Sequence, residues 1–180
     1  LNMLAMPWMA TGIFVYQSFI SESKMWAVYT IPKAFMVYSI TSIVTLFLSG
    51  FLVDKFTGRK LILFMNIPLL VAMFVLFQFN HEVFAYIFLG FIGISNGLAN
   101  ILGSSTWAEI YGVKYIGSIK ALTTAFMVFS TAFGTAVFGL LIDNGFTIEN
   151  IAFVGGTYIA ISLALLIIFR KSIEPIRLPN

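Results

Sequence analysis

The pentapeptide Gly93-Ile94-Ser95-Asn96-Gly97 has the G-x-S-x-G spacing of a nucleophile elbow, in which a serine attacks an acyl carbon. That chemistry needs a sharp strand-to-helix turn together with a histidine and an acid. Here the pentapeptide lies in the middle of a long apolar run, and the single histidine, His81, lies in a polar turn. Two glycines at this spacing instead allow helices to pack closely in lipid. We therefore expect no catalytic site, and, since cysteine is also absent, no metal site and no cofactor.

Charge gathers in one place, the stretch from Asp54 to Lys60. It reads Asp-Lys-Phe-Thr-Gly-Arg-Lys, so four charged residues fall in seven positions of a chain that is only 9% charged. Apolar runs lie on both sides, each about as long as the roughly 20 residues that cross a bilayer as a helix. Gly50 and Gly58 permit a sharp turn between these two runs. The three cations predict that the turn is cytoplasmic.

The composition indicates that the solvent of this chain is lipid. Hydrophobic residues make up 60% of it, whereas a soluble domain has under about 50% apolar and about 25% charged residues. We predict an all-α polytopic membrane protein with six transmembrane helices in one bundle over residues 1–171, followed by a cytoplasmic tail at residues 172–180. The six predicted spans are residues 1–20, 34–53, 61–79, 83–108, 119–142 and 151–169.

The positions of the cations predict the orientation of the bundle. If the first span leaves the cytosol, Lys24 and Lys33 are outside, and the other eight of the ten Lys and Arg residues are inside. Cytoplasmic loops carry an excess of basic residues, so we expect both ends of this chain to be cytoplasmic, in the cell (inner) membrane. The small net charge of +3 then reports topology and not a nucleic-acid partner. At the cytoplasmic edge we expect Glu109 to pair with Lys120.

Residues 50–60, which we call the charged loop, resemble the signature loop of the major facilitator superfamily of secondary transporters. The family pattern is G-x-L-x-D-[RK]-x-G-R-[RK]. The chain departs from it by one residue, because Phe56 and Thr57 both separate Lys55 from Gly58. The matching positions are Gly50, Leu52, Asp54, Lys55, Gly58, Arg59 and Lys60.

The resemblance implies a fold and a partner. Each six-helix half of this superfamily is a 3+3 inverted repeat, and residues 50–54 and 139–143 here share the pattern G-x-L-[VI]-D. Leu1 begins inside an apolar run, so we interpret the chain as the C-terminal half of a twelve-helix transporter whose N-terminal half is missing. Asp54 is expected to meet a helix N-terminus of that half, and Arg59 to support the same cytoplasmic gate, which holds the outward-open state.

Polar residues inside the spans are candidates for a substrate cavity, because polar groups that face lipid are costly. In the superfamily the first, second, fourth and fifth helices of each half line the cavity, and the third and sixth lie outside. The third span here is apolar between Asn66 and Gln78, in agreement with that division. Hydrogen bonding between helices is the alternative role for each candidate. The candidates are Tyr16, Gln17, Tyr38, Asn96, Asn100, Thr124 and Ser130.

The predicted function is secondary active transport of a small solute by alternating access. Residues 107–112 and 138–143 are similar to members near the monocarboxylate-type carriers, which favours an organic anion. Those carriers hold a cation deep in the second helix of this half, whereas residues 45–48 here read Thr-Leu-Phe-Leu. A multidrug or metabolite exporter, and a sensor or scaffold of the same fold that does not transport, are the alternatives. The substrate, a coupling proton and the direction of transport are left open.

Overall fold

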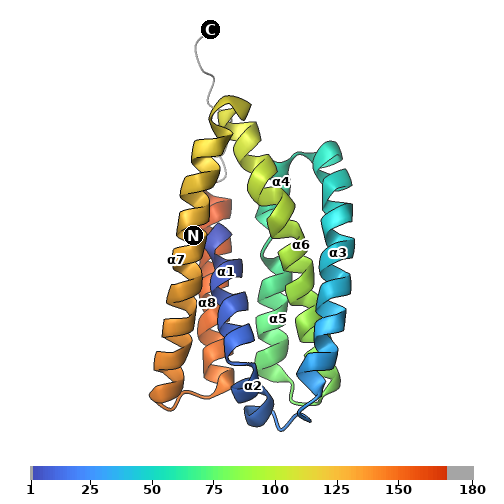
Figure 1. Ribbon diagram of the computed structural model, residues 1–180, viewed down its shortest axis with the longest axis vertical. Helices are drawn as coiled ribbons and strands as arrows, with labels where there is room; N and C mark the ends of the chain where they lie inside the picture. The colour runs from blue at the N-terminus through green and yellow to red at the C-terminus, as the bar shows by residue number, and fades with distance from the viewer. Residues whose placement is uncertain (1, 170–180) are drawn as a thin grey trace.

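The computed structural model describes residues 2–169, and all regular structure in that range is helical (Figure 1). Five helices are long and apolar enough to cross a membrane when Gly58–Gln78 is counted as one span. The number is six if the bent pair of helices Asn2–Val15 and Gln17–Ser23 also forms one span. This agrees with the predicted six-helix membrane fold. The elements are α1 (Asn2–Val15), α2 (Gln17–Ser23), α3 (Thr30–Phe56), α4 (Gly58–Leu61), η1 (Ile62–Phe64), α5 (Ile67–Gln78), α6 (Val83–Tyr111), η2 (Val113–Tyr115), α7 (Ile116–Asp143) and α8 (Ile148–Ile168).

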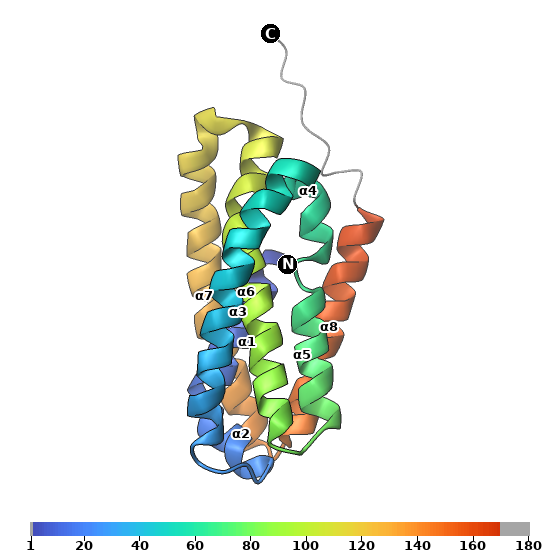
Figure 2. The same ribbon diagram turned by 90° about the vertical axis from the view of Figure 1, so that its right-hand side faces the viewer.

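Successive spans run in opposite directions, so the connections gather at two ends (Figure 2). The α3–α4 and α6–α7 connections lie together at the top of the view, which we call the loop end. The connections that follow α2, α5 and α7 lie at the opposite end. Arg170, Lys171 and Arg177, with the predicted tail, lie outside the described residues. Of the other seven cations, five belong to the loop end, and only Lys24 and Lys33 belong to the opposite end.

The first and third spans are broken. α1 and α2 are bent by 69° where the helix is interrupted at Tyr16. The third span is interrupted before Pro68, which has no N–H to donate and whose ring excludes the carbonyl of residue i−4. Two carbonyls at the second break accept from other helices. Ser95 Oγ donates to Met65 O at 3.2 Å, and Asn2 Nδ2 donates at 3.4 Å to Ile62 O, which also accepts from Met65 N. Such compensation is what permits broken helices in membranes.

The glycines of α6 bring it against α3. A Cβ atom at Gly97 would lie 2.7 Å from Ser42 O and 2.9 Å from Leu46 N, and one at Gly93 would collide with Thr41 Oγ1 and Tyr38 O. Thr41 Oγ1 donates to Gly90 O at 3.1 Å across the same contact. The predicted packing role of Gly93 and Gly97 is therefore confirmed, and the serine between them is a structural donor.

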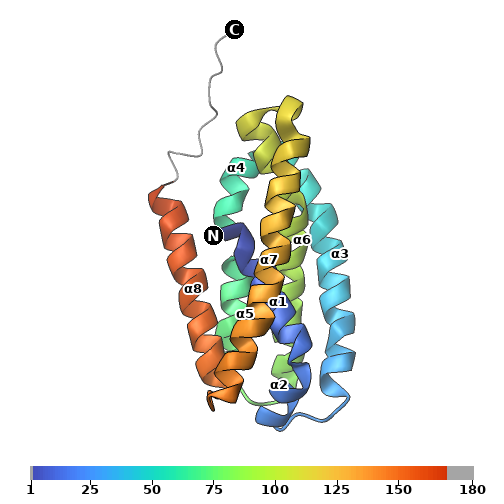
Figure 3. The same cartoon turned by 60° about the vertical axis from the view of Figure 1, so that its left-hand side comes forward.

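α1 lies inside the bundle, against α6, α7 and α8 (Figure 3). Its close approach to α7 also depends on a glycine, because a Cβ at Gly134 would lie 2.5 Å from Trp8 O. α3 and α7, in contrast, expose large apolar side chains along their length, among them Phe47 and Phe51 on α3 and Phe129 and Leu140 on α7. These exposed faces suit a chain that is surrounded by lipid or by further helices.

Candidate functional site

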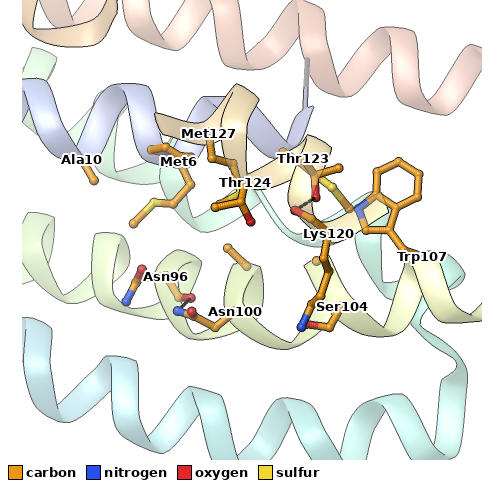
Figure 4. Close-up of a pocket in the computed structure, with 14 residues that line it drawn as sticks. Met6, Ala10, Asn96, Asn100, Ser104, Trp107, Lys120, Thr123, Thr124 and Met127 are labelled. Atoms are coloured by element: carbon orange, nitrogen blue, oxygen red, sulfur yellow. Dashed lines mark hydrogen bonds between the residues drawn. The ribbon is translucent and has the colours of Figure 1, made fainter. Parts of the chain in front are cut away.

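A cavity of about 340 Å³ lies between α1, α6 and α7, and we call it the central cavity (Figure 4). α5 and α8 contribute no lining residue, as expected for the third and sixth spans. α3 also contributes none, which differs from the expectation for the second span. The reason is that α3 packs on another face of α6, through Gly93 and Gly97. The polar lining residues are Asn96, Asn100, Ser104, Lys120, Thr123 and Thr124.

Three of the seven cavity candidates, Asn96, Asn100 and Thr124, line the central cavity. Asn96 Nδ2 donates to Ser42 Oγ of α3 at 2.9 Å, and Asn100 Nδ2 donates to Asn96 O at 2.8 Å. Asn96 therefore also forms a hydrogen bond between two helices, which is the alternative role considered for each candidate. Figure 4 shows Asn96 and Asn100 on α6 and Thr124 on α7, at the walls of one space.

The other four candidates lie elsewhere. Tyr16 donates from its hydroxyl to Thr135 O at 3.3 Å. Gln17 lines a separate hollow at the opposite end. Tyr38 packs edge-on against Phe14, with ring centroids 5.3 Å apart. Ser130 is buried, and its Oγ donates to Leu4 O at 3.0 Å. Tyr16 and Ser130 thus make contacts between helices and not with the central cavity.

Lys120 is a cavity residue that sequence reasoning missed. It is the only charged residue among the 14 that line the central cavity. The expected pairing of Lys120 with Glu109 is wrong, because Glu109 pairs with Arg59. The spacing carried a usable signal, because Lys120 and Thr124 are four residues apart and therefore share one face of α7.

Glu109 instead binds the charged loop. Its carboxylate accepts from Gly58 N at 2.6 Å, from Arg59 N at 3.1 Å and from Arg59 Nε at 3.4 Å. The acceptor thus caps the N–H groups at the start of α4, where a negative charge is favoured. Gly58 is required at this contact, since a Cβ there would lie 2.7 Å from Ser105 Oγ and 3.1 Å from Thr106 N.

The other residues of the charged loop face outward. Asp54 and Lys60 are exposed, and neither forms an ion pair within residues 2–169. Lys55 Nζ lies 5.3 Å from the ring centroid of Phe56. A Cβ at Gly50 would meet no atom within 4 Å. Among the described residues, therefore, nothing packs closely against Gly50, in contrast to Gly58.

Thr57 accommodates the extra residue of the charged loop. Its φ is 71° and its ψ is 143°, and it joins the end of α3 to the start of α4. A positive φ is unusual for a β-branched residue. The additional position relative to the family pattern is therefore absorbed at one strained joint, and Gly58 and Arg59 still reach Glu109.

The opposite end holds a second polar cluster that the sequence did not predict. Lys24 Nζ lies 2.7 Å from Glu149 Oε1 and 2.6 Å from Asn80 Oδ1, and its side chain is fully buried. Trp26 Nε1 donates to Asn80 O at 2.6 Å, and Ala27 N donates to Glu82 Oε1 at 2.9 Å. This cluster connects the segments around all three turns of the opposite end.

Comparison with known proteins supplies the family. No curated protein and no solved structure gives a significant match to this chain. The family model of the Major Facilitator Superfamily, however, matches residues 2–179, almost the entire chain. That match agrees with the charged loop and with the helical membrane fold, and the expected resemblance is confirmed. The chain belongs to the major facilitator superfamily of membrane transporters.

Proposed function

We propose that this chain moves a small solute across the membrane by alternating access and that the central cavity is its share of the substrate site. The observation that carries the proposal is the convergence of Asn96, Asn100 and Thr124 on one cavity near the middle of α6. Amide and hydroxyl groups that face a cavity inside a membrane are characteristic of a solute path. The rest of the site would come from a second six-helix bundle, the expected N-terminal half.

The charged loop is the proposed cytoplasmic gate. Glu109 holds Gly58 and Arg59 against α6, which supports the role of a rigid element at the loop end. Asp54 is exposed and so is available to meet a helix N-terminus of the other half. Gly50, Lys55 and Lys60 complete the loop. Both ends of the chain are cytoplasmic in this proposal, because five of the seven described cations lie at the loop end.

The favoured solute is an organic anion, and a coupling proton is compatible with this proposal. Export of a drug or metabolite would use the same cavity and gate. A sensor or scaffold of this fold would keep the gate contacts but would have no use for a polar cavity, which is why transport is the better reading of Asn96, Asn100 and Thr124.

Uptake by the full-length protein in proteoliposomes tests the proposal. A labelled panel of small organic acids, amines and neutral solutes is followed with and without a proton gradient. We expect Asn96→Ala and Asp54→Asn each to impair uptake of the same solute. Asn144→Ala is the matched control, because Asn144 is exposed at the opposite end and bonds only to Leu140 O. Uptake that is unaffected by either cavity or gate variant, or absent for every solute in both directions, would overturn the proposal.

A further inference from the structure

We infer that Lys120 binds the anionic group of the transported solute, which makes the substrate class a small monoanion such as an organic carboxylate. This inference rests on the function proposed above and adds the residue that selects the substrate by its charge. It begins from the position of Lys120 on α7, which places the side chain at the wall of the central cavity (Figure 4).

The charge of the central cavity is unbalanced. Lys120 is its only charged lining residue, and the other polar groups there are neutral amides and hydroxyls. Within residues 2–169 the carboxylates that lie within 4.0 Å of a cation are Glu149, paired with Lys24, and Glu109, paired with Arg59. Lys120 thus has no carboxylate partner in the described part of the chain.

The acid that was expected to pair with Lys120 is bound to the charged loop. Glu109, the acid that we first expected beside it, uses both carboxylate oxygens to bind Gly58 and Arg59. Lys120 is exposed in the described bundle, at the edge of the central cavity. An anion that enters the cavity would stabilise its ammonium group, because charge-assisted hydrogen bonds are stronger than neutral ones. With Glu109 bound to Gly58 and Arg59, Lys120 is free to bind the anionic group of a solute in the central cavity.

The walls of the central cavity indicate what else the solute carries. The α1 wall is apolar, with Met6, Pro7 and Ala10, whereas the α6 wall presents Asn96 and Asn100. A volume of about 340 Å³ lies at the lower end for small-molecule sites. These features fit a small amphipathic anion whose charged end lies at Lys120 and whose apolar part lies along α1.

Binding of matched charged and neutral ligands tests the inference. The full-length protein is titrated calorimetrically with a carboxylate that it transports and with the corresponding neutral amide. We expect Lys120→Gln to weaken carboxylate binding by about tenfold or more, since a hydrogen bond to a charged group is lost, and to leave amide binding unchanged. Lys120→Arg should retain most of the carboxylate affinity. Lys114→Gln is the matched control, because Lys114 is exposed near the same end but does not line the central cavity.

The outcomes separate this inference from the proposed function. Transport of a neutral or cationic solute that is insensitive to Lys120→Gln would overturn the inference and leave the transport function intact. Equal loss of carboxylate and amide binding would also overturn it, because Lys120 would then support the fold of the cavity. A Lys120 that snorkels to the headgroups would give unchanged carboxylate binding in Lys120→Gln. Absence of any transport by the unmodified protein would instead overturn the proposed function.

Discussion

The ammonium group of Lys24 lies 2.7 Å from the carboxylate of Glu149, and the Lys24 side chain is 0% exposed whereas that of Glu149 is 36% exposed. A buried charge is tolerated only when it is paired and hydrogen-bonded. Asn80 supplies the second partner of Lys24, at 2.6 Å. The segment between α2 and α3, the turn after α5 and the first turn of α8 are therefore held together, and we expect the opposite end to move as one unit.

The unequal exposure of this pair predicts unequal mutational effects. Glu149→Gln leaves a buried ammonium without its countercharge, and we expect the free energy of unfolding to fall by about 2 kcal/mol. Lys24→Met leaves Glu149 free to reach water, so a smaller loss of about 1 kcal/mol is expected. Thermal unfolding of the purified protein in detergent measures both. Glu22→Gln, which changes an exposed acid of α2, is the control. Equal losses in the two variants would contradict this account.

The contact between α3 and α6 makes a second prediction about stability. In Gly97→Ala the new methyl group would meet Ser42 O and Leu46 N, both backbone atoms, so the helices must separate. Overpacking of this kind costs about 1–3 kcal/mol. Gly103→Ala is the matched control on the same helix, because a Cβ at Gly103 would meet nothing within 4 Å. Melting temperatures of the two variants give the comparison, and a similar decrease in both would show that helix contact is not the cause.

The fold could be predicted well from the sequence, because the signals for membrane helices extend over many residues and do not depend on the position of any single side chain. Apolar runs of membrane-spanning length identify the helices, and Gly93 and Gly97 identify a close helix contact. The sites were predicted less well, because they depend on which face a side chain occupies. Asn96 and Thr124 lie in the central cavity, but Tyr38, chosen by the same criterion, packs against Phe14.

Charged residues near span ends were the hardest to place. Composition alone could not show whether Glu109 reaches forward to Lys120 or back to the charged loop, since both lie at the loop end. The outcome depends on the short helix that starts at Gly58, whose unsatisfied N–H groups attract the carboxylate. The sequence places Lys24 only on the outer side of the membrane, and the approach of Asn80 and Glu149 makes it a buried residue.

Thr57 provides a third prediction. Its φ of 71° lies in a region that glycine adopts without steric cost and a β-branched residue does not. Thr57→Gly should therefore raise the melting temperature, by an amount corresponding to about 1 kcal/mol of relieved strain. Thr57→Val keeps the β-branch, loses only the hydroxyl and serves as the control. If Thr57→Gly is destabilised instead, the joint between α3 and α4 is not strained in solution.

The contact between Glu109 and the charged loop predicts how access to the central cavity is controlled. Glu109→Ala leaves Gly58 N and Arg59 N without their acceptor, so the start of α4 should detach more often from α6. Because the chain contains no cysteine, Thr124→Cys places one thiol in the central cavity. We expect Glu109→Ala to increase the rate at which a membrane-impermeant maleimide modifies that thiol from the loop end. The increase is about tenfold if the lost contacts contribute roughly 1.4 kcal/mol.

Two variants make the accessibility measurement specific. Glu109→Gln keeps an oxygen that accepts from Gly58 N, so its modification rate should lie between that of Glu109→Ala and that of the protein with Glu109 intact. Glu22→Ala removes an exposed acid at the opposite end and should leave the rate unchanged. A modification rate that is the same in Glu109→Ala as with Glu109 intact would mean that this carboxylate only stabilises α4. A change in the rate would instead connect the contact between Glu109 and Arg59 to access to the central cavity, which Lys120 lines.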